Sequence, residues 1–195
     1  MENIIHQNGY LKLIIGPMFS GKSTELLREI RRYEAINKRV LVINHSLNKR
    51  YNTDSISTHD KSIFKKKGSS ELLILNNLGE LINEHNDKLE NAEIICVEEL
   101  QFFRDALEII PKLVDDKKKN IICAGLIGDY LRESFGDILK LIPFADEVKH
   151  VKALCSDCNN GTLGIFTKRI TNNTQKELIG TTDIYKVVCR HHYLQ

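Results

Sequence analysis

The chain has 195 residues, with 28 basic against 26 acidic side chains and a formal net charge of +2. Its hydrophobic fraction of 42% and charged fraction of 28% are ordinary for globular proteins, so they exclude disordered and fibrous classes. The near-neutral charge argues against a protein whose main task is to neutralise nucleic-acid phosphates. The length allows one main domain and a small appendage.

Sequence features that would direct the chain into or across a membrane are not apparent. No apolar run approaches the roughly 20 residues needed to cross a bilayer, and the first six residues lack the basic start and apolar core of a signal peptide. The five cysteines are an odd number, which disfavours a closed disulfide framework, and Cys96 and Cys123 lie in apolar runs typical of a core. We therefore expect a soluble, cytoplasmic protein with no membrane or nucleic-acid partner.

Short apolar runs alternate with amphipathic stretches through most of the chain. Strands are predicted over 11–15, 40–43, 72–75, 94–97 and 121–124, and helices over 24–37, 78–89 and 106–114. Residues 44–70 are polar and are predicted to form a long loop, which in a compact domain is usually functional or mobile. This alternation indicates an α/β fold with a mostly parallel sheet and helices on both faces.

Residues 16–23 fit the G-x-x-x-x-G-K-[ST] pattern of a phosphate-binding loop and lie between a predicted strand and a predicted helix. The glycines permit a tight turn whose backbone N–H groups face phosphates. Lys22 would reach the β- and γ-phosphates of a nucleotide, and the Ser23 hydroxyl would bind Mg²⁺. The candidate ATP-binding residues in this loop are Gly16, Pro17, Met18, Phe19, Ser20, Gly21, Lys22 and Ser23.

Glu98 and Glu99 stand directly after the strand predicted over 94–97. In open α/β sheets, ligands lie outside the carboxyl ends of the strands, where the phosphate loop also lies. One of these carboxylates could serve the metal, directly or through water, and the other could accept a proton. The reaction class predicted from these residues is phosphoryl transfer or hydrolysis.

Two Cys/His pairs near the C-terminus have the spacing of zinc ligands. Cys155 and Cys158 form one pair, and Cys189 with His192 forms the other; His192 is preferred over His191 because it keeps the two-residue spacing. Four protein ligands would make this Zn²⁺ structural, and a segment of some 40 residues with few apolar side chains needs such a staple to fold.

Together these residues resemble the thymidine kinases of animal cytosol, many bacteria and large DNA viruses. The similarity extends from Lys12 to Tyr193. Its pieces, in chain order, are residues 16–24, Thr58-His59-Asp60, Glu99-Leu100-Gln101-Phe102-Phe103, Arg132 through Phe135-Gly136, Thr167-Lys168-Arg169 and the two zinc pairs. A phosphate loop alone would not indicate one substrate, whereas this ordered set is specific.

The resemblance implies transfer of the ATP γ-phosphate to the 5′-hydroxyl of thymidine, with deoxyuridine as another possible acceptor. Glu99 takes the place of the general base, and Lys22 and Arg50 would neutralise the transferring phosphoryl group. Further ATP or Mg²⁺ contacts are implied for Asn48, Lys49, Arg50, Glu98 and Gln101. The residues implied for the nucleoside are Met18, Phe102, Tyr130, Thr167, Lys176, Glu177, Leu178, Ile179, Gly180 and Tyr185.

The resemblance also implies an architecture and an assembly. Residues 1–153 would form a P-loop, RecA-like ATP-binding domain, and residues 154–195 a zinc-ribbon-like domain with a lasso that closes over thymidine. Family members are commonly homotetramers inhibited by dTTP, and both properties are expected here. The competing hypotheses are a P-loop ATPase motor, which the near-neutral charge disfavours, and a nucleotide-sensing zinc-ribbon adaptor, which leaves the acidic pair unexplained.

Four positions depart from the family pattern. Glu98 replaces the usual Asp, and its extra methylene makes a water-mediated metal contact more plausible than a direct one. Ile127 stands where an Asp is usual, Asp129 where a small polar residue is common, and Tyr130 where Phe is commoner. None of these changes removes the base, the phosphate loop or a zinc ligand, so the sequence predicts an active kinase.

Overall fold

The computed structural model describes residues 7–48, 70–173, 178, 180 and 182–195, and the backbone of 55–57 and 63–65. Six strands form one parallel sheet in the spatial order β5-β2-β6-β7-β1-β8. These strands are β1 (Tyr10–Gly16), β2 (Val40–His45), β5 (Glu71–Leu75), β6 (Ile94–Val97), β7 (Asn120–Leu126) and β8 (Glu147–His150). The predicted parallel α/β sheet is confirmed.

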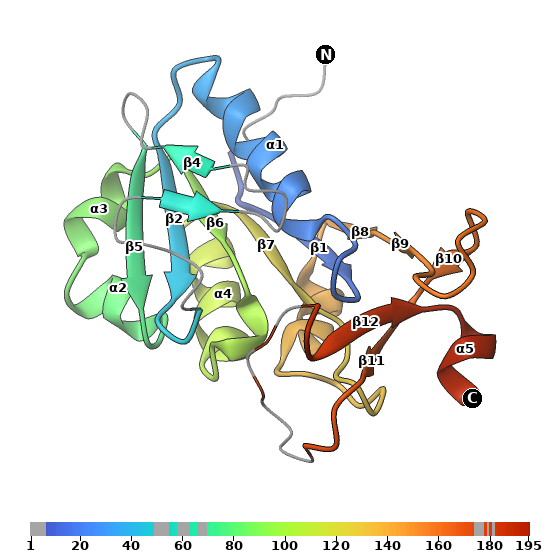
Figure 1. Cartoon of the computed structure of the whole chain (residues 1–195). Coiled ribbons are helices and arrows are strands. Elements are labelled where there is room, and N and C mark those ends of the chain that lie inside the picture. Colours follow the sequence, from blue (N-terminus) through green and yellow to red (C-terminus); the bar gives the residue numbers. More distant parts are fainter. Residues whose placement is uncertain are drawn as a thin grey trace.

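Helices cover both faces of the sheet, as Figure 1 shows. On one face α1 (Lys22–Glu34) packs Leu26, Leu27 and Ile30 against apolar side chains of β1, β2, β6 and β7. The other face is covered by α2 (Gly79–Asn83), α3 (Asn86–Asn91), α4 (Ala106–Asp115) and the 3₁₀ helix η2 (Ile138–Phe144). Because both faces are covered, the central strands are buried along almost their whole length, which explains their continuous apolar runs.

Three local features differ from the sequence predictions. The helix predicted over 78–89 is two short helices, α2 and α3. The helix breaks at Glu84 and His85, where φ is −117° and −126°, and Leu81 and Leu89 on either side of the break are both buried in the core. The loop predicted over 44–70 contains an antiparallel pair, β3 (Ser55–Ser57) with β4 (Ile63–Lys65). Edge strand β8 was not predicted, because its sequence Glu-Val-Lys-His carries a single aliphatic residue.

The C-terminal part consists of short strands and one short helix beside the β1 side of the sheet (Figure 1). Strand β9 (Ala153–Leu154) pairs with β10 (Leu163–Gly164), and β11 (Phe166–Arg169) pairs with β12 (Tyr185–Val188). Helix α5 (Arg190–Leu194) follows directly. The small core of this C-terminal part is formed by Cys155, Val188 and Cys189, with Cys158 and Tyr193 packed against them. So small a core needs additional stabilisation.

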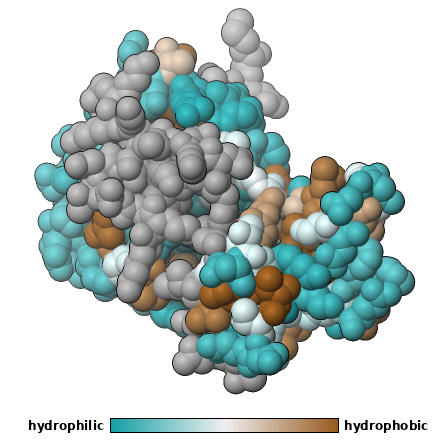
Figure 2. Space-filling model, in the orientation of Figure 1, coloured by the Kyte–Doolittle hydropathy of each residue, from teal (hydrophilic) through white to brown (hydrophobic). Residues whose placement is uncertain are grey.

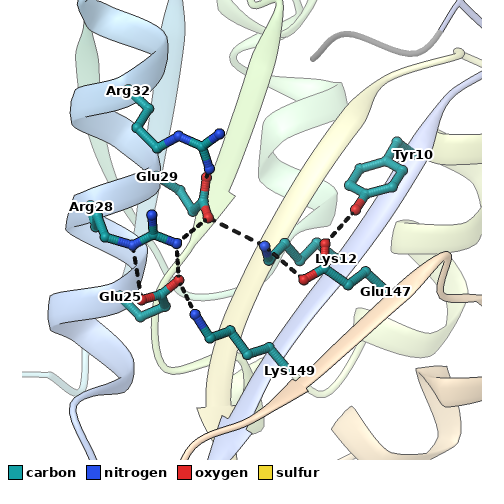
Figure 3. Close-up of polar contacts among 8 residues, drawn as sticks. All are labelled: Tyr10, Lys12, Glu25, Arg28, Glu29, Arg32, Glu147 and Lys149. Carbon is teal, nitrogen blue, oxygen red and sulfur yellow. Dashed lines mark hydrogen bonds and ion pairs between the residues drawn. The ribbon is translucent and has the colours of Figure 1, made fainter. Parts of the chain in front are cut away.

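A network of charged side chains fixes α1 to the edge of the sheet (Figure 3). Glu29 on α1 is 3% exposed and pairs with Lys12 of β1 at 3.2 Å. Lys12 also contacts Glu147 of β8 at 2.9 Å, and Glu25 on α1 contacts Lys149 of β8 at 2.5 Å. Since α1 begins at the phosphate loop, these pairs hold that loop's helix in place on β1 and β8.

The surface shown in Figure 2 is mostly hydrophilic where it is described, with apolar residues in small patches. Exposed apolar side chains such as Leu154 and Leu194 are scattered over different elements. Among the described residues, none of the helices combines the length and apolarity required to cross a bilayer.

Candidate active site and metal centre

The phosphate loop connects the carboxyl end of β1 to the first turn of α1. Gly21 has φ 82° and Phe19 has φ 60°, both in the left-handed region that a tight anion-binding turn requires. A Cβ at Gly16 would lie 2.4 Å from the carbonyl oxygen of Val151, so only glycine fits there. The Ser20 hydroxyl closes the turn by donating to the Pro17 carbonyl at 2.8 Å. The predicted loop is therefore present.

Two side chains at the start of α1 point into this site. Lys22 is 8% exposed and donates to the Pro17 carbonyl at 2.7 Å, which places its ammonium over the loop. Ser23 Oγ lies 2.5 Å from Glu98 Oε1, although the two residues are 75 positions apart in the chain. A hydroxyl beside a carboxylate at the phosphate loop is the ligand pair that Mg²⁺ takes in P-loop enzymes.

Glu99 lies next to this pair and is almost fully buried, at 7% exposed. Its backbone has φ 52° and ψ 45°, a left-handed conformation that is uncommon outside glycine. Gln101 lies in the 3₁₀ helix η1 (Leu100–Phe102), and its side-chain amide donates a hydrogen bond to Glu99 Oε2 at 2.6 Å. The carboxylate is therefore held at the carboxyl end of β6, as the sequence predicted.

Aromatic rings line the neighbouring end of β2. Phe102 lies between the rings of His45 and Phe135, with ring centroids 5.7 and 5.6 Å away. Burial lowers the pKa of His45 below its ordinary value and so favours the neutral ring. Asn48 is buried and donates to Asn44 Oδ1 at 3.3 Å. The structure thus brings Asn48 and Phe102 to the same strand ends as the phosphate loop.

Thr167 of β11 connects the phosphate loop to the C-terminal part. Its hydroxyl oxygen accepts a hydrogen bond from the backbone N–H of Met18 at 3.0 Å, and the residue is 5% exposed. The two residues are 149 positions apart in the chain. Both were expected near the nucleoside, and the structure places them in direct contact.

Tyr130 lies in a tight turn that follows β7. Asp129 Oδ1 accepts hydrogen bonds from the backbone N–H groups of Leu131 at 2.9 Å and Glu133 at 3.0 Å, which fixes the turn. The guanidinium carbon of Arg169 lies 3.6 Å from the Tyr130 ring centroid. One face of the ring is therefore covered by Arg169, which makes a cation–π contact with it.

Arg169 also joins Tyr185 to the segment that precedes it. It donates to the Tyr185 hydroxyl at 2.6 Å and to the Asn173 carbonyl at 2.8 Å. Tyr185 in turn donates to the Leu178 carbonyl at 2.8 Å. Gly180 packs against Ile184, whose Cδ1 would lie 2.4 Å from any added Cβ. Among the predicted site residues, Lys49, Arg50, Lys176, Glu177 and Ile179 lie outside the described residues.

The four predicted zinc ligands converge on one point. Their ligand atoms all lie within 4.8 Å of one another. His192 Nδ1 is 3.4 Å from both Cys158 Sγ and Cys189 Sγ and 3.6 Å from Cys155 Sγ, and the Sγ atoms of Cys158 and Cys189 are 3.8 Å apart. Tetrahedral Zn²⁺ with Zn–S of about 2.3 Å and Zn–N of about 2.0 Å requires separations of about 3.8 and 3.5 Å. The residues fit the ion.

The environment of Cys155 also favours the thiolate that zinc requires. Burial opposes ionisation, but backbone N–H groups of Cys189, Cys158 and Asp157 outweigh it and lower the pKa of Cys155 to about 6. The other two cysteines, Cys96 and Cys123, are buried in the sheet, where burial raises the pKa of each thiol. Their predicted role as core residues is confirmed.

Comparison with known proteins identifies the family. The family model described as thymidine kinase matches residues 9–193. The chain belongs to the thymidine kinase family. "Thymidine kinase a" of Arabidopsis thaliana is 41% identical over 187 residues, covering 96% of this chain and 76% of that protein. The thymidine kinase of sheeppox virus is 38% identical over 185 residues, covering 95% of this chain and 97% of that protein.

A third relative is "Thymidine kinase, cytosolic" of Gallus gallus, which is 35% identical over 187 residues, covering 96% of this chain and 78% of that protein. The family-model match over residues 9–193 includes both the phosphate loop and the zinc-ligand cluster. Three residues that make contacts within this site were not predicted to do so from the sequence, namely Asp129, Arg169 and Tyr193. Arg169 was visible only as part of the motif Thr167-Lys168-Arg169, which by itself assigns no contact.

Proposed function

We propose that this protein is an ATP:thymidine 5′-phosphotransferase that produces dTMP and ADP for DNA precursor salvage, with deoxyuridine as a second acceptor. The contact between Ser23 and Glu98 at 2.5 Å carries the proposal, because it joins the phosphate loop to the acidic strand end. Glu99, the adjacent residue, is then close enough to the transferring phosphate to act on the accepting hydroxyl. The names of the relatives supply the nucleoside.

On the ATP side, the backbone of residues 16–23 would cradle the phosphates, and Lys22 would neutralise the charge that develops on the transferring group. Asn48 and Gln101 would border the nucleotide, and the predicted partners Lys49 and Arg50 would contribute further positive charge. Glu99 would hydrogen-bond the 5′-hydroxyl and take its proton as the hydroxyl attacks.

On the nucleoside side, the base would stack on the ring of Tyr130 and lie against Met18 and Phe102. Thr167 and Tyr185 would frame the pocket. Residues 176–180 would close over the base and read it through main-chain groups. Arg169 supports this arrangement because it contacts both Tyr130 and Tyr185.

Two metal ions belong to the proposal. Ser23 and Glu98 would hold Mg²⁺, directly or through water, and the ion would supply charge neutralisation on the β- and γ-phosphates when bound with ATP. Cys155, Cys158, Cys189 and His192 would hold a structural Zn²⁺ that stabilises residues 154–195 as a separate domain from residues 1–153. We also propose a cytoplasmic homotetramer that is subject to feedback by dTTP.

The decisive experiment is a panel of nucleosides incubated with ATP and Mg²⁺, with identification of the phosphorylated product. We expect dTMP, a smaller yield from deoxyuridine, and no transfer by Lys22→Ala. Nucleic-acid-stimulated ATP hydrolysis without nucleoside phosphorylation would favour an ATPase motor. ATP binding with no turnover on any nucleoside would favour a nucleotide-sensing adaptor.

A further inference from the structure

Tyr193 of helix α5 is bonded to the turn that carries Tyr130. Its hydroxyl donates to the Tyr130 carbonyl at 2.7 Å across 63 positions of sequence. Tyr193 directly follows the zinc ligand His192, and its ring packs on Phe166 with centroids 5.3 Å apart. The residue is therefore both part of the small core around the zinc cluster and a direct partner of the turn after β7.

A second contact strengthens this connection. The guanidinium carbon of Arg132, two residues after Tyr130, lies 4.5 Å from the Tyr193 ring centroid and 5.7 Å from that of Phe166. A cation over two aromatic rings is attracted to both. The turn is thus attached to α5 by a hydrogen bond at Tyr130 and by a cation–π contact at Arg132.

The internal shape of the turn has a different origin. Asp129 bonds to the backbone N–H groups of Leu131 and Glu133, and both bonds lie within the turn itself. Tyr193 instead connects the turn to α5, on the side where Arg169 of β11 covers one face of the Tyr130 ring at 3.6 Å. Lys168 of β11 also donates to the His192 carbonyl at 2.7 Å, so β11 and α5 form one unit.

We propose that Tyr193 is a positioning residue for the nucleoside pocket, through which the zinc-bound helix α5 holds the stacking ring of Tyr130 in place. The inference rests on the proposed role of Tyr130 in binding the base. It assigns the metal site a second task beyond folding the C-terminal part. Cys189 and His192 would anchor α5 when they hold the ion, α5 presents the Tyr193 hydroxyl, and that hydroxyl holds the turn of Tyr130 against Arg169.

The test is Tyr193→Phe, which keeps the ring on Phe166 and beneath Arg132 and removes only the hydroxyl. We expect zinc to remain at one ion per chain by metal analysis and ATP affinity to be unchanged in direct titration. Thymidine should bind roughly 2- to 10-fold more weakly, the effect of losing one hydrogen bond. Tyr10→Phe is the matched control, because it removes a phenol hydrogen bond of similar length, 2.8 Å to Glu147. Tyr10 is the first residue of β1, at the opposite end of this strand from the phosphate loop.

A spectroscopic measurement reports on the ring itself. The chain has no tryptophan, so Tyr130→Trp introduces a single fluorophore at this position. With zinc bound in both proteins, we expect the fluorophore in Tyr130→Trp/Tyr193→Phe to be quenched more readily by acrylamide than in Tyr130→Trp alone, because its turn is no longer tethered.

The outcomes separate the inference from the function on which it rests. Unchanged thymidine affinity in Tyr193→Phe, or equal quenching in the two tryptophan proteins, would overturn the tether. Loss of zinc from Tyr193→Phe would also overturn it, since the hydroxyl would then act on the metal site and not on the turn. Unchanged thymidine affinity in Tyr130→Ala would instead remove Tyr130 from the pocket and with it that part of the proposed function.

Discussion

The amide of Gln101 links the Glu99 carboxylate to strand β7. Nε2 donates to Glu99 Oε2 at 2.6 Å, and Oε1 accepts from the backbone N–H of Leu126 at 3.0 Å. Two glycines make room for this bridge. A Cβ at Gly125 would lie 2.8 Å from Gln101 Oε1, and one at Gly136, where φ is +64°, would lie 2.3 Å from the Gln101 carbonyl oxygen.

Substitution of Gln101 tests this bridge. Gln101→Glu keeps the acceptor for Leu126 but places a second carboxyl group against Glu99, so we expect a stable protein whose kcat falls roughly 10- to 100-fold through misplacement of the base. The KM for ATP should change far less than kcat, because Gln101 bonds directly to Glu99 and would only border the nucleotide. Steady-state kinetics in both substrates measure the split. A raised KM for ATP with normal kcat would instead support the direct ATP or Mg²⁺ contact that the family resemblance implies.

Glu99→Gln preserves the shape of the side chain but removes its basicity. We expect turnover to fall roughly 10²-fold or more, the usual contribution of a general base, while ATP affinity is retained. Product formation under saturating substrates and a separate nucleotide titration measure the two quantities. Glu90→Gln is the control, because Glu90 is an exposed carboxylate whose partner is Lys117. Near-normal turnover in Glu99→Gln would exclude Glu99 as the base.

Thr167→Val tests the connection between the phosphate loop and β11. The valine has nearly the same shape but cannot accept the hydrogen bond from the Met18 N–H. We expect the free energy of unfolding to fall by about 1–3 kcal/mol, because a partly buried donor loses its partner. Urea denaturation measures this value. Thr171→Val is the control, since Thr171 is an exposed threonine far from the Met18 N–H in the chain. Equal stability of the two variants would contradict the connection.

Cys158→Ser should prevent zinc binding and destabilise the C-terminal part of the protein more than the sheet. We expect loss of stoichiometric metal and of thymidine affinity, with much of the ATP affinity retained, because the sheet has its own apolar core. Metal analysis and separate titrations of ATP and thymidine test this. Cys123→Ala removes a thiol outside the cluster and should keep the ion. Absence of zinc from the wild-type protein would refute the site, and equal loss of both ligands would show that its effect is not confined to the nucleoside.

The charged network on α1 predicts a dependence of stability on acid pH. Hydrogen bonds from Arg28 and Lys149 lower the pKa of Glu25 from 4.5 to about 2. Because the folded pKa is the lower one, its contribution to stability is complete above about pH 4.5 and is lost as the pH falls toward 2. Urea midpoints measured between these pH values should decline less steeply in Glu25→Gln. Parallel declines in the two proteins would show that Glu25 does not contribute.

The sequence by itself determined those features of this protein that are set by residues close together in the chain. The loop at 16–23 could be predicted because phosphate binding requires glycines, a lysine and a hydroxyl at fixed spacing. The zinc ligands could be predicted for the same reason, since two residues between ligands suit one tetrahedral ion. Strand β6 was predicted at its observed bounds, Ile94–Val97, because a strand buried on both faces is a continuous apolar run.

Only the tertiary structure decided the contacts between distant positions. No spacing rule relates Ser23 to Glu98, Met18 to Thr167 or Tyr193 to Tyr130, because each pair meets through the order of strands in the sheet and the placement of the C-terminal hairpins. The division of the predicted helix over 78–89 was also not visible in the sequence, because Leu78, Leu81 and Leu89 would share one face of a continuous helix as well.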